Sequence, residues 1–290
     1  MEQRPVVSIV TPSYNSGRFL ERTIESVLTQ DYPHIEYIVM DGGSTDDTIS
    51  ILERYQDRLT YSSARDKGPA DAVNQGFGRS SGSILGWLNA DDEYTPGAVS
   101  AAVRQMAQHP EAGVVYGQAV WIDENGAEIG PYPTTSPYRE GMFQQECGIC
   151  QPAAFLRRDA FFDCGGFKLD QNSCWDYDLW IRIARKHRFV AVPEMLARSR
   201  MHRGSITLGG RRKVFEQNIA LLRREYGYVP VNWVYGYLTF LRDGRDQFFE
   251  PLQHSALTYA GSLAVGSYYN YRHLLRYWKE WGSRLRRFAF

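Results

Sequence analysis

The 290-residue sequence lacks any apolar run that approaches the roughly 18 residues needed by a membrane-spanning helix. The stretch from Met1 to Pro5 and the short apolar run from Val6 to Val10 are together too short for the core of a secretory signal peptide. With 43% hydrophobic and 23% charged residues, the composition is that of an ordinary soluble globular protein. We therefore expect a cytoplasmic protein of one large domain, or of a domain plus an appendage, with peripheral attachment to the inner face of the cell membrane left open.

A net charge is also lacking, because 33 Lys and Arg residues balance 33 Asp and Glu residues. This balance predicts neither a nucleic-acid partner nor an acidic one. The segment from Thr11 to Asn15, which follows the first predicted strand, has no G-x-G-x-x-G pattern, so a dinucleotide-binding dehydrogenase is not expected. The same segment lacks the glycine-rich basic loop expected of a sugar nucleotidyltransferase.

Cysteine is scarce, and its four copies are Cys147, Cys150, Cys164 and Cys174. The first two have the spacing of half a zinc site or of a redox pair. The other two are separated by nine residues, which is not a zinc-finger spacing. Buried free thiols are therefore expected rather than a structural zinc ion or a disulfide.

The first 110 residues contain short β-branched or apolar runs that alternate with segments of helical periodicity. We expect strands at 6–10, 35–40, 59–64 and 84–88, and helices at 17–29, 48–55, 67–76 and from 98 onward. This alternation predicts a parallel, doubly wound sheet. Further on, strands are expected at 113–120, 127–129, 153–156, 190–192 and 196–201, helices at 158–162, 176–187 and 211–226, and a proline-rich loop, a candidate mobile lid, at 132–138.

The stretch from Ser83 to Glu93 places two adjacent acids, Asp91 and Asp92, directly after a buried strand. The carboxyl ends of strands are where open α/β sheets bind ligands. Adjacent carboxylates repel each other unless they share a cation, and a divalent ion that bridges to phosphate oxygens would serve. The alternative is two solvated acids at the start of the following helix.

From Val229 onward the sequence is densely aromatic, and residues 272–290 carry six Lys or Arg against the single acid Glu280, a net charge of +5. Aromatic and basic residues at helical spacing suit the headgroup layer of an anionic membrane. The alternative is a helical cap that packs on the rest of the protein and has a solvated basic face.

Taken in order, the motifs resemble those of the inverting nucleotide-sugar glycosyltransferases of family two, which have a GT-A-type fold. The resemblance covers about residues 6 to 210 and depends on the order and spacing of the motifs. The matching segments are VSIVTPSYN (7–15), DGGSTD (41–46), DKG (66–68), DAVNQG (71–76), GWLNADD (86–92), GGF (165–167), DYDLWIRIA (176–184) and His202.

The resemblance implies a nucleotide-sugar donor, with a UDP-sugar favoured over a GDP- or dTDP-sugar. Thr11, Pro12 and Tyr14 would hold the nucleobase, and Asp41 would accept a hydrogen bond from it. Asp66 would reach the ribose or base, and Lys67 would support a phosphate. The remaining donor-binding residues implied are Asp71, Asn74, Asn89, Ala90 and Asp91, although Asp71 and Asn74 are also placed to tie their helix to its loop.

The resemblance also implies Mn²⁺ or Mg²⁺, which would stabilise the diphosphate leaving group. Asp91 would be the main ligand, with Asp92 close by and His202 facing the metal or the diphosphate. The family often has aspartate where this chain has Asn89, so the site has one charge fewer.

Inversion needs a general base that deprotonates the acceptor hydroxyl, and Asp176 matches the family's position for it. Asp178 is the second candidate, with organisation of the loop as its other role. Trp175 would offer an apolar platform to a sugar ring, and Gln151 would line the acceptor side.

We therefore predict a GT-A-type catalytic domain at 1–227, with a donor half at 1–110 and an acceptor half at 111–227, followed by a helical region at 228–290. Its expected activity is inverting transfer of a sugar to a hydroxyl of a glycan or glycolipid. The alternatives are a non-catalytic nucleotide-sugar-binding scaffold and, less expected, a sugar nucleotidyltransferase.

Overall fold

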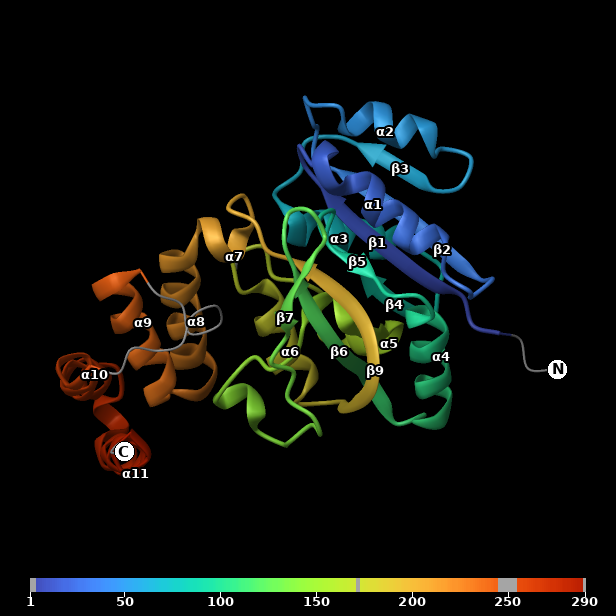
Figure 1. The fold of residues 1–290 in the computed structure, drawn as a ribbon. Helices are drawn as coiled ribbons and strands as arrows, with labels where there is room; N and C mark the ends of the chain where they lie inside the picture. Colours follow the sequence, from blue (N-terminus) through green and yellow to red (C-terminus); the bar gives the residue numbers. More distant parts are fainter. Residues whose placement is uncertain (1–3, 171–172, 245–254, 289–290) are drawn as a thin grey trace. The chain divides into compact units, whose positions relative to one another are not determined.

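A nine-stranded mixed sheet organises the chain in the computed structural model, which describes residues 4–170, 173–244 and 255–288 (Figure 1). The strand order is β3-β2-β1-β4-β8-β6-β9-β5, and β7 pairs with β6. The strands are β1 (Val7–Ser13), β2 (Ile35–Asp41), β3 (Thr60–Ser63), β4 (Ile84–Trp87), β5 (Glu93–Tyr94), β6 (Ala112–Ile122), β7 (Glu128–Pro131), β8 (Ala154–Arg157) and β9 (Arg188–Arg200).

The first four strands are mutually parallel, as predicted, with β1 between β2 and β4. Helices connect them: α1 (Gly17–Leu28), α2 (Thr48–Arg54) and α3 (Pro69–Arg79), while α4 (Ala98–Gln108) follows β5. Because neighbouring side chains of a strand point to opposite faces, Val7 and Ile9 pack with α1, α2 and α4, whereas Val10 faces α3. The sheet is therefore covered on both sides, as expected of a doubly wound fold.

Beyond β6 the sheet becomes mixed, because β8 runs antiparallel to both β4 and β6. The helices here are α5 (Arg158–Asp163) and α6 (Trp175–Ile183). Trp180 of α6 stacks on Trp87 of β4 at 5.3 Å between ring centroids. Since Trp87 pairs with Val10, α6 lies on the α3 side of the sheet. The expected hairpin of β6 and β7 is present.

The structure differs from the sequence-based expectation at β9, which is one 13-residue strand where two short strands were predicted. Between the two predicted strands the pairing of β6 with β9 shifts in register. Tyr116 pairs with Ala191, but Gln118, two residues on, pairs with Met195, four residues on. Pro193 lies in the skipped segment and has no N–H to donate, so the ladder is broken there without ending the strand.

The proline-rich loop at 132–138 contains no helix or strand, as predicted. Its backbone is nevertheless tied to the sheet, because Tyr132 donates its N–H to Ala119 and Thr135 donates its N–H to Gly148. The Thr135 carbonyl also accepts a hydrogen bond from the Tyr116 hydroxyl at 2.6 Å. These bonds argue against the mobile lid that the composition suggested.

The chain divides into two compact units, the first formed by residues 1–140 and 147–202, the second by 141–146 and 203–290. The second unit is helical, as expected for the C-terminal region. It contains α7 (Ile206–Gly209), α8 (Arg211–Tyr226), α9 (Val231–Asp243), α10 (Ala256–Tyr269) and α11 (Leu274–Phe288).

The contacts group α8 with this second unit, whereas the sequence analysis assigned residues 211–227 to the catalytic domain. Trp233 and Tyr237 of α9 pack against Phe215 of α8. Of the helices that the structure describes, none combines the length and the apolar character needed to cross a bilayer. Phe248 and Phe249 of the aromatic tail lie outside the described residues, and only the backbone is described for Arg286 and Arg287.

The contact of α3 with the sheet generates a first prediction, for which α3 supplies its own control. A Cβ at Gly76 would lie 2.6 Å from one methyl carbon of Val10 and 2.9 Å from the other, whereas a Cβ at Gly78 meets nothing within 4 Å. We expect Gly76→Ala to lower the free energy of unfolding by about 1–3 kcal/mol through overpacking. Gly78→Ala should raise it by roughly 0.5–1 kcal/mol.

Urea unfolding of the two variants measures this difference. Equal effects of the two substitutions would show that α3 does not pack on β1 as closely as the structure has it.

Candidate active site

The carboxyl ends of the parallel strands meet at one edge of the sheet. Ser13 at the end of β1 pairs with Asp41 at the end of β2, and Asp41 pairs with Ser63 at the end of β3. The turn from Asn89 to Asp92 follows β4 at the same edge. The segments predicted to bind the donor therefore come together at a single place.

Asp41 is almost fully buried, and its carboxylate is used by its own loop. One oxygen accepts the N–H groups of Gly43 and Ser44 at 3.0 and 2.9 Å and the Ser63 hydroxyl at 2.6 Å. The other oxygen accepts the Ser44 hydroxyl. The structure thus brings Asp41 to the expected edge and gives its carboxylate a role in shaping the loop.

Asp66 lies beside this loop. Its carboxylate accepts the Gly68 N–H at 2.8 Å, and a Cβ added at Gly42 would lie 3.2 Å from one of its oxygens. A side chain at position 42 would therefore crowd Asp66 away from the end of β2. Lys67 next to it is exposed, and its backbone N–H bonds to Asp71 at 3.1 Å.

The three residues predicted to hold the base differ in exposure. Thr11 is buried and its hydroxyl pairs with that of Tyr37 at 3.0 Å, while Pro12 is buried within β1. The ring of Tyr14 is 64% exposed at the end of β1, so it is the one of the three that presents a free surface.

Asn74 on α3 ties two segments together. Its amide donates to the carbonyl of Phe167 at 2.8 Å and accepts the N–H of Phe167 at 2.9 Å. A Cβ at Gly166 would lie 2.8 Å from the Asn74 oxygen, which accounts for a glycine there. The second of the two roles predicted for Asn74, that of joining its helix to a loop, is the one these contacts support.

Asp91 and His202 meet at the end of β4, although 111 positions separate them in the sequence. The Oδ2 atom of Asp91 lies 2.9 Å from Nε2 of His202. The His202 ring lies 4.9 Å from the ring of Phe19 on α1. Both side chains are partly exposed, at 26% and 15%, so they are accessible to a ligand.

Arg200, at the end of β9, holds the backbone beneath this pair. Its buried guanidinium donates to the carbonyl of Asp91 and to that of Asp123, each at 2.8 Å. It also forms an ion pair with Glu93 and lies 5.0 Å above the Phe19 ring. Sequence reasoning missed Arg200, Glu93 and Phe19, because nothing in the spacing of these residues shows that β9 ends beside the turn that follows β4.

Asp92 points into the protein, unlike Asp91. One carboxylate oxygen accepts the Arg200 N–H at 2.8 Å and the other accepts the Asn89 amide at 3.2 Å. Burial, aided by the neighbouring Asp91 carboxylate, raises the pKa of Asp92 to about 8. The two adjacent acids therefore have different surroundings, and only Asp91 faces His202.

Gln151, the first residue of a short 3-10 helix (Gln151–Ala153), contacts the turn after β4. Its amide donates to the carbonyl of Trp87 at 2.8 Å and accepts a hydrogen bond from Asn89 at 2.8 Å. Asn89 thus lies between Gln151 and Asp92, and Ala90 beside it is buried. Gln151 supports the turn from within, instead of lining an open acceptor surface.

The first turn of α6 carries Asp176 and Asp178, and their surroundings differ. Asp178 is fully buried, 2.7 Å from Nε of Arg182 and 3.6 Å from Nζ of Lys168. Asp176 is half-buried, and burial raises its carboxyl pKa above the ordinary value although the Tyr177 N–H donates to it. Asp178 therefore has the contacts of a structural ion pair, whereas Asp176 has no cationic partner among the residues that the structure describes.

Trp175 places the start of α6 beside the end of β4. Its ring lies 5.8 Å from that of Trp87 and 4.5 Å from that of Phe167. The residue is only 6% exposed, so it is largely a member of this aromatic cluster. Asp176 directly follows Trp175 in the chain, and the turn that begins at Asn89 follows Trp87. The predicted base and the acidic turn are therefore each attached to a member of this aromatic cluster.

The donor set at Asp91 and His202 fits a divalent cation in part. A carboxylate oxygen and an imidazole nitrogen both ligate Mn²⁺, and the 2.9 Å between them shows that the two groups converge. Within the described residues, no group of three or more His, Cys, Asp or Glu could hold a metal ion. The protein would therefore supply two ligands, and phosphate oxygens and water would supply the others.

The four cysteines differ in burial: Cys150 and Cys174 are buried, as expected, whereas Cys147 and Cys164 are partly exposed. Neither the disulfide nor the zinc site that the C-x-x-C spacing allowed is present among the described residues.

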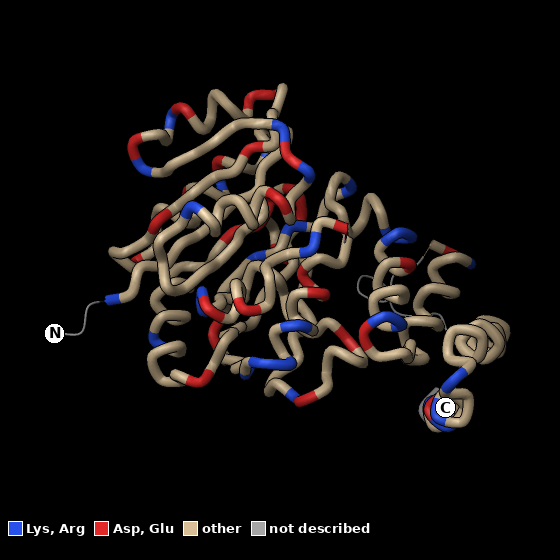
Figure 2. Tube along the Cα trace, turned by 180° about the vertical axis from the view of Figure 1, so that it is seen from behind, with Lys and Arg blue, Asp and Glu red and all other residues tan. Residues whose placement is uncertain are grey.

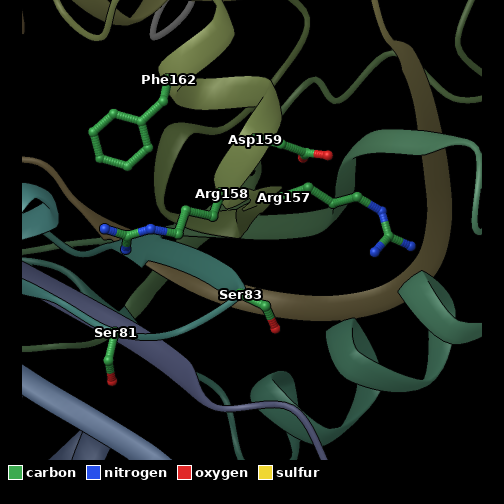
Figure 3. Close-up of a pocket in the computed structure, with 6 residues that line it drawn as sticks. All are labelled: Ser81, Ser83, Arg157, Arg158, Asp159 and Phe162. Carbon is green, nitrogen blue, oxygen red and sulfur yellow. The ribbon is translucent and has the colours of Figure 1, made fainter.

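A cavity of about 530 Å³ lies at the opposite end of β4 (Figure 3). Ser81 and Ser83, which line it, precede that strand, and Arg157 pairs with Ile84 at its start. Arg157 and Arg158 bond mainly to carbonyls of neighbouring elements, including Met106 and Phe77. This cavity is separate from the residues that the sequence analysis singled out.

A doubly wound α/β sheet with polar side chains at the carboxyl ends of its strands belongs to the class of folds that bind ligands at that edge. The sequence model of glycosyl transferase family 2 matches residues 8–166, more than half of the chain, and the chain therefore belongs to this family. The resemblance stated from the motifs is thereby confirmed.

One relative, an uncharacterized glycosyltransferase of Rickettsia felis, is 28% identical over 213 residues, which are 68% of this chain and 34% of that protein. The chain thus spans about a third of that relative's length. Among solved structures, S. aureus TarS in complex with UDP-GlcNAc has a TM-score of 0.63 at 15% identity and covers 91% of this chain and 81% of its own. A mannosyltransferase of Pyrobaculum calidifontis in complex with GDP-Man and Mn²⁺ has a TM-score of 0.58 at 20% identity. The similarity covers 92% of this chain and 76% of the mannosyltransferase chain.

The two arginines that bind Glu93 yield a second prediction. The side chain of Arg200 is 0% exposed, whereas that of Arg198, which binds the other oxygen of Glu93 at 3.0 Å, is 30% exposed. We expect Arg200→Ala to cost about 3–5 kcal/mol of unfolding free energy, because it removes a buried guanidinium from one oxygen of Glu93 and from the carbonyl of Asp91. Arg198→Ala should cost about 1 kcal/mol or less.

Chemical denaturation of both variants tests this expectation. Similar losses for the two would mean that burial does not distinguish these arginines energetically.

Proposed function

We propose that this chain is an inverting glycosyltransferase that moves a sugar from a nucleotide-sugar donor, with UDP-sugars favoured, to a hydroxyl of a glycan or glycolipid. The observation that carries the proposal is the Asp91–His202 pair, which follows β4 at the carboxyl edge of a family 2 sheet, while Trp175 at the start of α6 packs beside Trp87 at the end of β4. The TarS and mannosyltransferase structures of similar fold contain UDP-GlcNAc and GDP-Man, which supports a nucleotide-sugar donor as the substrate class.

In this proposal, the donor lies along the ends of β1 to β4. Tyr14 offers its exposed ring to the nucleobase, Asp66 accepts a hydrogen bond from the ribose or base, and Lys67 is near the phosphates. The buried residues Thr11, Pro12, Asp41 and Asn74 shape the loops that hold these groups. Their hydrogen bonds within the protein support this division of roles.

Asp91 and His202 are the proposed ligands of Mn²⁺ or Mg²⁺, with Asn89 and Ala90 in the same turn. When bound, the cation supplies electrostatic stabilisation for the departing nucleoside diphosphate. Asp92 orients the turn from inside through its bonds to Asn89 and to the Arg200 N–H. The aspartate that the family often has in place of Asn89 would face the buried Asp92, and here an amide donates to that carboxylate instead.

Asp176 is the proposed general base, which takes the proton from the acceptor hydroxyl as this attacks the anomeric carbon. Burial raises its pKa, so the carboxylate is a stronger base than an exposed aspartate. Asp178, neutralised by Arg182 and Lys168, is not free to serve this role and positions the helix. Trp175 would present the edge of its cluster to the acceptor sugar.

Donor binding gives a third prediction. We measure thermal shifts with a panel of nucleoside diphosphates and nucleotide sugars, each with and without Mn²⁺. Ligands that carry one particular nucleobase should stabilise the folded protein. A ligand at about 100 times its dissociation constant adds roughly 2.7 kcal/mol to the free energy of unfolding. Asp91→Asn and His202→Ala should remove the Mn²⁺-dependent part of this stabilisation.

Asp57→Asn is the matched control, because Asp57 is exposed in the turn between α2 and β3. Its response to the ligands should equal that of the unmodified protein. The absence of any nucleotide response would overturn the proposed donor site.

The fourth prediction concerns Asp176. We expect Asp176→Asn to lower kcat by about 10²–10⁴-fold with donor affinity unchanged, because it removes only the base. In the unmodified enzyme, activity should fall as pH decreases through the raised pKa of Asp176, and this acidic limb should vanish in the variant. A raised pKa stabilises the folded state at low pH and loses that contribution as pH rises, so the variant should be no less stable at pH 7.

Asp178→Asn separates catalysis from structure, because it leaves Arg182 without its buried partner. We expect a loss of roughly 3 kcal/mol in unfolding free energy for this variant. Full turnover by Asp176→Asn would rule out Asp176 as the base.

A further inference from the structure

The neutral total of the chain conceals two strongly and oppositely charged units. Residues 141–146 and 203–290 carry 14 Lys and Arg against seven Asp and Glu, a net charge of +7. The first unit carries 19 Lys and Arg against 26 Asp and Glu, a net charge of −7. Figure 2 shows the charged positions along the trace. The basic excess belongs to the helical unit, and the candidate active site belongs to the acidic one.

The hairpin of α10 and α11 exposes large apolar side chains close to its turn. Tyr268, Tyr271, Leu275 and Trp278 are between 48% and 80% exposed. Positions 271, 275 and 278 share one face of a helix by their spacing. Trp278 donates its indole N–H to the Ser267 hydroxyl at 2.9 Å, which places α11's first turns beside the end of α10.

The opposite side of α11 fixes this orientation. Tyr277 is fully buried, and its hydroxyl donates to the Ser262 carbonyl at 2.8 Å. Trp281 donates its indole N–H to the carbonyl of Tyr259 at 3.1 Å. The aromatic residues thus divide into two sets, one that docks α11 on α10 and one that is left in solvent.

Basic side chains border the exposed set. Arg272 and Lys279 are exposed and, seven positions apart, lie on one side of the helix. The Arg272 guanidinium lies 5.4 Å from the ring centre of Tyr271. Tyrosine and tryptophan rings, a leucine and flanking cations are the combination that suits the interface of an anionic bilayer.

We propose that this face, formed by Tyr268, Tyr271, Arg272, Leu275, Trp278 and Lys279, docks the protein on an anionic lipid surface. The rings and Leu275 enter the headgroup layer, and Arg272 and Lys279 bind lipid phosphates, with attraction from the net charge of the unit. A second copy of the chain is the less suitable occupant, because a two-fold contact would bring the basic residues of both copies together. The proposal does not depend on the transferase activity.

Co-sedimentation of the full chain with lipid vesicles tests the proposed membrane-docking face. The full chain should bind vesicles of equal parts phosphatidylglycerol and phosphatidylcholine at low salt, and bind phosphatidylcholine alone weakly. Raising the salt should weaken the binding, because exposed charges are screened. Each neutralised basic residue should lower the affinity about five-fold, so Arg272→Gln with Lys279→Gln should lower it about 25-fold.

Leu275→Glu with Trp278→Glu should abolish binding. Ile129→Glu and Arg79→Gln are the matched controls, because both residues are exposed in the first unit, and these variants should bind like the unmodified chain. Circular dichroism establishes that each variant is folded. Three outcomes would each overturn the proposal. They are equal binding to anionic and neutral vesicles, an equal loss of vesicle binding in the control variants, and a dimer of the full chain that Leu275→Glu dissociates.

Discussion

The buried guanidinium of Arg200 is the interaction on which the candidate site depends. It joins β9, the turn after β4 and the turn between β6 and β7, segments that are distant in sequence, by donating to the carbonyls of Asp91 and Asp123. Arginine suits this task because its planar group donates five hydrogen bonds and keeps its charge when buried. Glu93 neutralises that charge, and Phe19 covers it. The position of His202, two residues further along, follows from this anchor.

Around this anchor, the acids of the site fall into two kinds. Asp41, Asp92 and Asp178 are buried and satisfied by N–H groups, hydroxyls or cations of the protein itself. Asp91 and Asp176 keep part of their surface in solvent. A site that must hold a highly charged diphosphate needs a rigid frame as well as reactive groups, and fixed hydrogen bonds supply that frame without reorganisation when the ligand arrives.

Much of this arrangement could be predicted from the sequence, because it depends on local patterns. The alternation of β-branched runs with helical periodicity located β1 to β4 and their helices, and the motifs located the turns that follow. Exposure was harder to predict: the motifs placed Thr11 at the nucleobase and Asp92 close to the metal, but the hydrogen bonds turn both side chains inward. The roles of Arg200 and of the single strand β9 depend on pairing across more than 70 positions, which no local pattern encodes.

The opposite charges of the two units affect how the molecule behaves in bulk solution. Its sequence isoelectric point is about 7.0, the value at which proteins usually migrate least and adhere to no charged resin. A chain with seven excess charges of each sign on separate units still has strongly charged regions of both signs at that pH. It would be retained on both anion and cation exchangers. In concentrated low-salt solution, the basic unit of one molecule would attract the acidic unit of another, so that added salt increases rather than reduces solubility.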